Sequence, residues 1–195
     1  MKRVILAVSL LLPLSSSVAL AQLTKMTVGY GVIGGTSFPT WMAKESGIFR
    51  KNDLDVQLVY FRGGTTAVMA LLSRESPISQ VAGPAIVSAS LRGSDTVMIA
   101  GGIVTADQWL MSRPEIKTAE QLKGGSVAVA VFGGLADFLA RIALKRLGLN
   151  PVKDVAIVQI GTVPERLSAL QTGKVQATML RAPDSFIAEK RAFTF

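Results

Sequence analysis

Short apolar runs alternate along this chain with longer segments in which apolar side chains recur every three or four positions. The short runs predict strands, and the longer segments, several of them opened by glycine or proline, predict helices. Strands that alternate with helices in this way predict an α/β fold with parallel sheets and right-handed crossovers. The predicted strands span residues 26–30, 56–61, 78–81, 97–103, 109–112, 127–131, 155–160 and 176–180.

Part of the pattern occurs twice. Residues 55–84 align without a gap onto residues 154–183, 99 positions further on, and six of the thirty aligned pairs are identical. Average composition gives about two such matches by chance. Each copy reads as strand, turn, helix and strand, so the sequence predicts two similar α/β lobes, which favours a clamshell that closes on a small molecule. The identical pairs are Asp55/Asp154, Val56/Val155, Val59/Val158, Ala70/Ala169, Leu71/Leu170 and Pro84/Pro183.

The first 21 residues have the pattern of a cleaved secretion signal. Two positive residues at positions 2–3 precede an apolar stretch at 4–14, and a small-residue site predicts cleavage after Ala21. The alternative is a membrane anchor, but the apolar run is shorter than the ~20 residues that span a bilayer, and Pro13 interrupts it. The rest of the chain has no run of that length without a charge or a glycine.

Composition and charge limit the cellular compartment and the kinds of partner that the protein can have. The chain has no cysteine, so it has no disulfide, no thiol nucleophile and no cysteine for a lipid anchor. Its net charge of +8 falls to +6 when the positive charges of Lys2 and Arg3 leave with the signal. The positive residues are scattered, which indicates mild attraction for anions and no nucleic-acid binding. An exported protein without disulfides or a lipid anchor suits a bacterial periplasm.

Turns that combine glycine with a hydroxyl side chain recur at predicted helix starts, at residues 35–37, 64–66 and 161–162. Gly83 and the pair Gly133-Gly134 lie at equivalent turns. A helix N-terminus presents unpaired N–H groups and the positive end of the helix dipole, so such turns favour carboxylate, sulfonate or phosphate oxygens. The alternative is ordinary N-capping by serine and threonine.

A few charged and aromatic side chains add to these turns. Arg62 and Arg181 each end a predicted strand and either pair with an anionic ligand or serve as solvated or structural charges. Asp137, one turn into its predicted helix, either complements the helix dipole or reaches a ligand donor. Trp41 and Trp109 are candidate stacking surfaces, although aromatic residues more often belong to the core.

One glycine motif suggests an alternative function. Gly29, Gly31 and Gly34 form a GxGxxG pattern between a predicted strand and a helix, and Arg62 ends the next strand, where an NADP-type oxidoreductase places a cation. However, the loop continues through Ser37 before the helix begins, whereas a dinucleotide site needs the helix to start at the glycines. The predicted export also argues against this function.

The sequence contains little that could catalyse a reaction. It has no histidine, so it has no imidazole base, no histidine metal ligand and no Ser-His triad. It also lacks GxSxG and GxxxxGK[ST] motifs, and its carboxylates are few and scattered. We therefore expect a protein that is not an enzyme and has no catalytic residues, no metal site and no cofactor.

The C-terminal half resembles the second lobe of type II periplasmic solute-binding proteins of ABC importers, in their nitrate, taurine and aliphatic-sulfonate binding branch. The resemblance rests on residues 122–193, which include the run GGLADFLARIALKRLGLNPVKDVAIVQIGTVPERLSALQTGKVQATMLRAPDSF. The upstream segments GYGVIGGTSFPTWMAKESGIFRKNDLDVQLV, RGGTTAVMALLSRE and GPAIVSASLRGSD agree with it. Fungal thiamine-pyrimidine synthases share this fold, but they use a histidine and a pyridoxal cofactor, and this chain has no histidine.

The resemblance implies two Rossmann-like lobes that hold a small solute between them and deliver it to a membrane permease. The implied solute is an organic anion such as a sulfonate or carboxylate, or nitrate, and the implied binding protein is a monomer. A sensory or scaffold relative with the same lobes is the further alternative. The loops that match the family give these candidate ligand-binding residues: Thr36, Ser37, Gly64, Thr65, Gly83, Gly133, Gly134, Asp137, Thr162 and Arg181.

The resemblance also implies an organisation along the chain. We expect a signal peptide over residues 1–21, lobe one over 22–107 and lobe two over 108–192, while residues 193–195 would begin a return crossover to lobe one. The sequence stops where that return begins, which predicts a C-terminally truncated chain with an incomplete lobe one. An unfinished sheet edge and exposed apolar surface would make such a chain poorly stable on its own.

Overall fold

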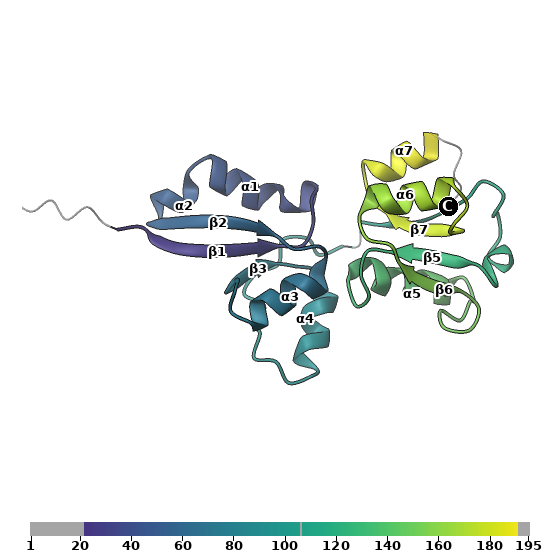
Figure 1. Ribbon diagram of the computed structural model, residues 1–195, viewed down its shortest axis with the longest axis horizontal. Helices are drawn as coiled ribbons and strands as arrows, with labels where there is room; N and C mark the ends of the chain where they lie inside the picture. Colours follow the sequence, from purple (N-terminus) through teal and green to yellow (C-terminus); the bar gives the residue numbers. More distant parts are fainter. Residues whose placement is uncertain (1–21, 106, 191–195) are drawn as a thin grey trace, which may run out of the picture.

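The computed structural model describes residues 22–105 and 107–190, whose strands form two separate sheets (Figure 1). The first sheet has the order β2-β1-β3 and the second the order β4-β7-β5-β6. All strand pairs are parallel except β4 with β7. The strands are β1 (Thr24–Tyr30), β2 (Leu54–Tyr60), β3 (Ile78–Gln80), β4 (Trp109–Ser112), β5 (Ser126–Val129), β6 (Ala156–Gln159) and β7 (Ala177–Leu180).

Helices flank each sheet and alternate with the strands as the sequence predicts. We call the first sheet with α1–α4 lobe one and the second sheet with α5–α7 lobe two. Proline lies in the first turn of α1, α4 and α6, where a missing N–H is tolerated. The helices are α1 (Phe38–Glu45), α2 (Ile48–Lys51), α3 (Gly64–Leu72), α4 (Gly83–Ser90), α5 (Leu135–Arg146), α6 (Val163–Gln171) and α7 (Asp184–Lys190), with 3-10 turns η1 (Gly35–Ser37) and η2 (Glu120–Leu122).

The predicted repeat is confirmed, residue for residue, by the sheet registers. Thr27 of β1 pairs with Gln57 of β2, and 99 positions later Ser126 of β5 pairs with Ala156 of β6. The same offset relates the pairing of β1 with β3 to that of β5 with β7. It also carries the bounds of α3 onto those of α6. The predicted fold class, two α/β lobes with mostly parallel sheets, is therefore confirmed.

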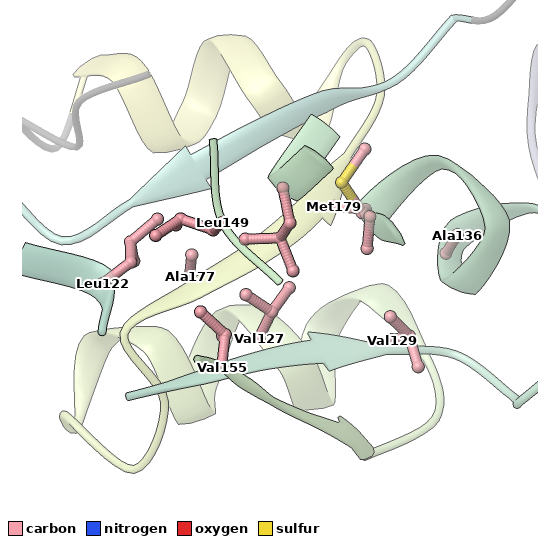
Figure 2. Close-up of a cluster of buried hydrophobic side chains, with 10 residues drawn as sticks. Leu122, Val127, Val129, Ala136, Leu149, Val155, Ala177 and Met179 are labelled. Atoms are coloured by element: carbon pink, nitrogen blue, oxygen red, sulfur yellow. The ribbon is translucent and has the colours of Figure 1, made fainter. Parts of the chain in front are cut away.

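The core is better developed in lobe two than in lobe one. Its main cluster joins β5, β7 and α5 (Figure 2). Val127, Val129 and Leu144 of this cluster have no exposed surface. In lobe one the main cluster lies between α3 and α4 and is built around Val68 and Ile86. Helices α1 and α2 bury no residue. Lobe one therefore holds its sheet with less buried apolar surface.

One predicted strand is wrong. Residues 97–103 form no strand, and Val97 and Ile99 are 77% and 80% exposed. The apolar pattern there is suited to a sheet, but a strand also needs a partner whose N–H and C=O groups it can pair with. Among the described residues, β3 pairs only with β1. In lobe two the equivalent strand, β7, has β4 as its second neighbour.

Other expectations fall partly or wholly outside the described residues. The signal peptide of residues 1–21 and the return crossover of residues 193–195 are not described by the structure. Over the residues that it does describe, we find no helix with the length and apolar character needed to cross a bilayer.

Candidate ligand site between the lobes

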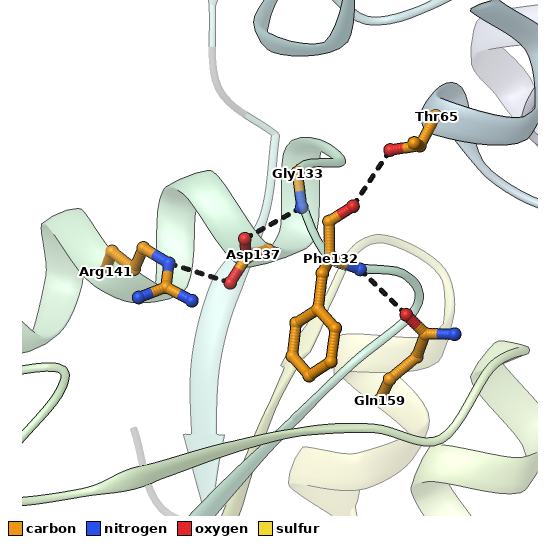
Figure 3. A network of polar contacts seen from close by, with 6 residues as sticks. All are labelled: Thr65, Phe132, Gly133, Asp137, Arg141 and Gln159. Carbon is orange, nitrogen blue, oxygen red and sulfur yellow. Dashed lines mark hydrogen bonds and ion pairs between the residues drawn. The ribbon is translucent and has the colours of Figure 1, made fainter. Parts of the chain in front are cut away.

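The carboxyl ends of the strands bring the two lobes into contact. In Figure 1 the arrowheads of β1 and β2 point toward lobe two. The hydroxyl of Thr65, in the first turn of α3, donates a 2.9 Å hydrogen bond to the carbonyl of Phe132, in the loop after β5 (Figure 3). A Cβ atom placed on Gly63 would lie 2.4 Å from Cγ1 of Val131. Glycine at position 63 therefore leaves room for the side chain of Val131 from lobe two to pack against the backbone of lobe one.

A hollow of about 170 Å³ lies at this meeting point. Two of its lining residues belong to lobe one, and the remainder come from the end of β6 and the loops after β5 and β6 in lobe two. Its volume is below the ~300–1,000 Å³ that is usual for drug-sized ligands, so it suits a solute of a few non-hydrogen atoms. The lining residues are Arg62, Thr66, Ala130, Val131, Gln159, Ile160 and Gly161.

Arg62 reaches across the hollow toward the start of α6. Its Nη1 would lie 3.6 Å from a Cβ placed on Gly161. Glu165, in the first turn of α6, has its pKa lowered first by hydrogen bonding from the backbone and side chain of Thr162, and further by the charges of Arg62 and Arg166. The predicted candidate Arg62 is thus placed at the boundary of the lobes, as a cation contributed by lobe one.

Arg181 is the second cation at this boundary, contributed by lobe two. Its Nη1 lies 3.4 Å from Oδ2 of Asp107, in the connection between the lobes, and 3.4 Å from Oγ1 of Thr36 in lobe one. Only 13% of the Arg181 side chain is exposed. Thr36 is itself held by Gln80 of β3, whose amide nitrogen donates to the Thr36 carbonyl. The structure therefore brings together two predicted site residues that are 145 positions apart.

The predicted residues of the loop after β5 hold that loop in shape. Asp137 is 6% exposed, and its two carboxylate oxygens accept bonds from the backbone N–H of Gly133 and from Nε of Arg141, each at 2.9 Å (Figure 3). Gly134 is the N-cap of α5, and Gly133 has a φ of 74°. Gln159, which the sequence did not single out, accepts a bond from the Phe132 N–H. These hydrogen bonds hold the loop in the conformation in which the Phe132 carbonyl accepts the bond from Thr65.

The start of α6 is closed by its own side chains. Both the backbone N–H and the hydroxyl of Thr162 donate to Oε2 of Glu165, and Thr162 caps the helix in return. This capping box satisfies the donors that an anion would otherwise use. In this structure Thr162 therefore acts as a cap, which was the structural alternative to ligand binding.

The remaining predicted residues differ in their surroundings. Ser37 is 2% exposed and donates to the Val32 carbonyl at 2.6 Å, so its hydroxyl is already engaged. Gly64 is buried, and an added Cβ would lie 3.3 Å from that of Ala85, which reflects the packing of α3 on α4. Gly83 is exposed, with open space beside it.

The glycines of the GxGxxG motif have packing roles. A Cβ placed on Gly29 would lie 2.5 Å from Oγ of Ser79, and one on Gly31 would touch the backbone of Gly63 at 3.3 Å. A 3-10 turn separates Gly34 from α1. The first glycines therefore permit close contacts of β1 with its neighbours.

Arg166 is the main residue that sequence reasoning missed. It is 5% exposed, donates to the carbonyls of Gly161 and Met179, and its Nε has no hydrogen-bond partner among the described residues. Burial, followed by the nearby positive charge of Arg181, lowers the pKa of Arg166 to about 10, so the side chain stays protonated at neutral pH. The repeat could have pointed to it, because position 166 aligns with the small apolar residue Ala67, which predicts a position that faces the core.

The two tryptophans and the acidic side chains were the other candidates for contact with a ligand or a metal ion. Trp41 packs edge-on against Tyr30, with 5.9 Å between the ring centroids, and Trp109 is 42% exposed at the start of β4. Among the described residues, no three Asp or Glu side chains are grouped so that they could hold a metal ion.

Comparison with solved structures identifies the fold as that of periplasmic binding proteins. The aliphatic sulphonate binding protein SsuA of Escherichia coli matches 86% of this chain and 57% of its own length, with a TM-score of 0.66 and 22% identity. The nitrate-binding protein NrtA of Synechocystis PCC 6803 matches 83% of this chain and 48% of its own, with a TM-score of 0.61 and 19% identity.

Sequence comparison assigns the family. The model of the NMT1-like family matches residues 20–192, and the chain belongs to this family. A protein of Brucella abortus strain 2308, named as a binding protein, is 29% identical over 160 residues. The alignment covers 82% of this chain and 49% of that relative, so the chain spans about half the length of the curated relatives it matches.

Proposed function

We propose that this chain is the solute-binding component of an ABC importer. It captures a small organic anion, such as a sulfonate or carboxylate, or nitrate, between lobe one (residues 22–107) and lobe two (residues 108–192). It acts as a monomer in the periplasm, after removal of residues 1–21, and delivers the solute to a membrane permease. It performs no catalysis of its own.

One observation carries the proposal: each lobe contributes a cation where their strand ends meet. Arg62 of lobe one lines the hollow beside Gln159 and Gly161 of lobe two. Arg181 of lobe two reaches Thr36 of lobe one. A solute bound between them touches both lobes, so its binding energy favours the closed arrangement over an open one.

The relatives support the class of solute. The matched proteins of Escherichia coli and Synechocystis are named for an aliphatic sulphonate and for nitrate. Both solutes are anions, and their oxygens are arranged tetrahedrally around sulfur or in a plane around nitrogen. Guanidinium groups recognise such oxygens well because their N–H donors form a planar fork.

Thermal unfolding of the purified chain with a panel of solutes tests the proposal. We expect methanesulfonate, acetate or nitrate to stabilise it by about 2.7 kcal/mol at a concentration 100-fold above Kd, with uncharged propanamide as the reference at equal ionic strength. Arg181→Met should abolish the shift. Arg113→Met, which removes an arginine paired with Glu115 in the same lobe, should leave it unchanged. Stabilisation by none of the anions would contradict the proposal.

A further inference from the structure

Arg181 already has a carboxylate partner within the chain. Among the described residues, Asp107 is the one acidic side chain within 4.0 Å of its guanidinium. Asp107 lies in the connection between the lobes, two residues before β4, and belongs to no helix or strand. The group that would bind the anionic end of a solute is therefore paired with a side chain of the connection.

The pair is loose when compared with another in lobe two. Nη1 of Arg181 and Oδ2 of Asp107 are 3.4 Å apart, and 34% of the Asp107 side chain is exposed. By contrast, Nε of Arg141 and Oδ1 of Asp137 are 2.9 Å apart, and only 8% of the Asp137 side chain is exposed. Charge-assisted hydrogen bonds usually measure about 2.7–2.9 Å, so Asp107 satisfies Arg181 incompletely. A partly exposed, imperfect pair is one that a better anion can replace.

A second positive charge lies close behind Arg181. Arg166 is buried and donates to two backbone carbonyls, and no described carboxylate lies within 4.0 Å of it. The two arginines are near enough for the charge of Arg181 to lower the pKa of Arg166. Asp184, in the first turn of α7, acts on Arg166 in the opposite direction. An anion at Arg181 thus gains from the field of both guanidinium groups.

We propose that Asp107 is an internal competitor for the solute: its carboxylate pairs with Arg181 in the free chain, and an anionic solute takes its place. This inference rests on the function proposed above. The competition lowers the affinity for every anion by the same factor, because each of them has to displace the same carboxylate from Arg181. Displacement also releases Asp107 from Arg181, which contacts Thr36 of lobe one, so solute binding is coupled to the contact between the lobes.

Neutralising Asp107 tests the competition. Calorimetric titration with methanesulfonate and with nitrate, at fixed ionic strength, should show that Asp107→Asn binds about three- to tenfold more tightly than the wild type. Asp107→Ser removes the charge with a smaller side chain and should show the same gain. Glu115→Gln is the matched control, because it neutralises the carboxylate of another arginine pair, and its affinity should equal that of the wild type.

The outcomes separate the two proposals. Tighter binding by both Asp107 variants supports the competition, even if the wild type binds too weakly to measure. If the wild type binds an anion and both variants bind it equally or less tightly, the competition is overturned while the proposed function stands. If no protein in the set binds either anion, both proposals fail for these solutes. If only one variant folds, as judged by circular dichroism, its affinity alone decides.

Discussion

The two lobes share one backbone register but begin their helices with different chemistry. In lobe two, each helix has an acidic residue in its first turn: Asp137 in α5, Glu165 in α6 and Asp184 in α7. In lobe one, none of α1 to α4 has one. A first-turn carboxylate satisfies the free N–H groups and the dipole that would otherwise attract an anion. The helix starts of lobe one are thus the more open to an anion.

The cations are divided in a complementary way. Position 166 holds a buried arginine in lobe two, whereas its counterpart in lobe one is Ala67, and position 181 holds an arginine where lobe one has Ala82. Lobe two therefore has two arginines at positions where lobe one has alanines, and lobe one contributes Arg62 at a position where lobe two has Gly161. The repeat conserves backbone geometry and leaves the site chemistry to differ between its copies.

The largest expected difference between the lobes lies in their cores. Leu71 and Leu170 are an identical pair of the repeat, but Leu170 has no exposed surface while Leu71 is partly exposed. We expect Leu170→Ala to lower the free energy of unfolding by about 2–5 kcal/mol, and Leu71→Ala by about half as much, because less apolar surface is lost. Urea unfolding followed by circular dichroism measures both. Equal losses would mean that lobe one is as tightly packed as lobe two.

The next comparison concerns the contact between the lobes. Gly63→Ala places a Cβ 2.4 Å from Cγ1 of Val131 at φ 83° and ψ 164°, a region that glycine alone adopts readily, so we expect weaker solute binding together with a loss of about 1–3 kcal/mol of stability from the backbone conformation alone. Isothermal titration and urea unfolding give the two quantities.

A matched control and a rescue separate the two effects of that substitution. Gly93 has a similar φ of 88° with open space beside it, so Gly93→Ala should lose stability without losing affinity. Adding Val131→Ala to Gly63→Ala removes the clashing Cγ1 and leaves Cβ of residue 131 at 3.4 Å, an ordinary contact, so affinity should recover. An unchanged affinity in Gly63→Ala would show that the lobes do not meet there in the bound state.

These comparisons show which parts of the structure the sequence could predict. The repeat and the alternating pattern predicted the order of the elements, because residues close in sequence decide where each helix and strand forms. The same reasoning failed for residues 97–103, because their apolar pattern suits a strand but pairing depends on a partner far along the chain.

The candidate site was predictable in position more than in detail. Glycine and hydroxyl residues at the strand ends marked the boundary of the lobes, and Thr65 and Thr36 do make contacts across it. The side-chain partners were not predictable, because Asp137 and Thr162 have equally good structural and ligand-binding roles until the donors around them are known. That these ten residues bind the solute stays a prediction, and of them the titration of Arg181→Met tests Arg181.

The capping of α6 offers a smaller contrast. Thr162 caps α6 with its side chain, whereas the counterpart in lobe one, Gly63, caps α3 without one. Thr162→Ala should lower the free energy of unfolding by about 1 kcal/mol, since the N-terminal donors of the helix lose an acceptor. Thr172→Ala, at the opposite end of the same helix, is the control, because its hydroxyl bonds only carbonyls of that helix and an effect within about 0.5 kcal/mol is expected. A similar loss in both variants would remove the special role of the cap.

The smallest expected effect is a pH dependence of the free energy of unfolding that comes from α6 and that its counterpart in lobe one, α3, lacks. Hydrogen bonds from Thr162 hold the pKa of Glu165 below its usual 4.5, and the aligned residue in lobe one is Thr66. Because the folded-state pKa is depressed, ionised Glu165 stabilises the fold above pH 4.5, and this contribution is lost as pH falls through the folded-state value. Urea unfolding of wild type and Glu165→Gln should therefore differ at pH 7, and the difference should shrink steadily as the pH is lowered below 4.5. A difference that does not shrink at lower pH would mean that the carboxylate charge is not what stabilises the start of α6.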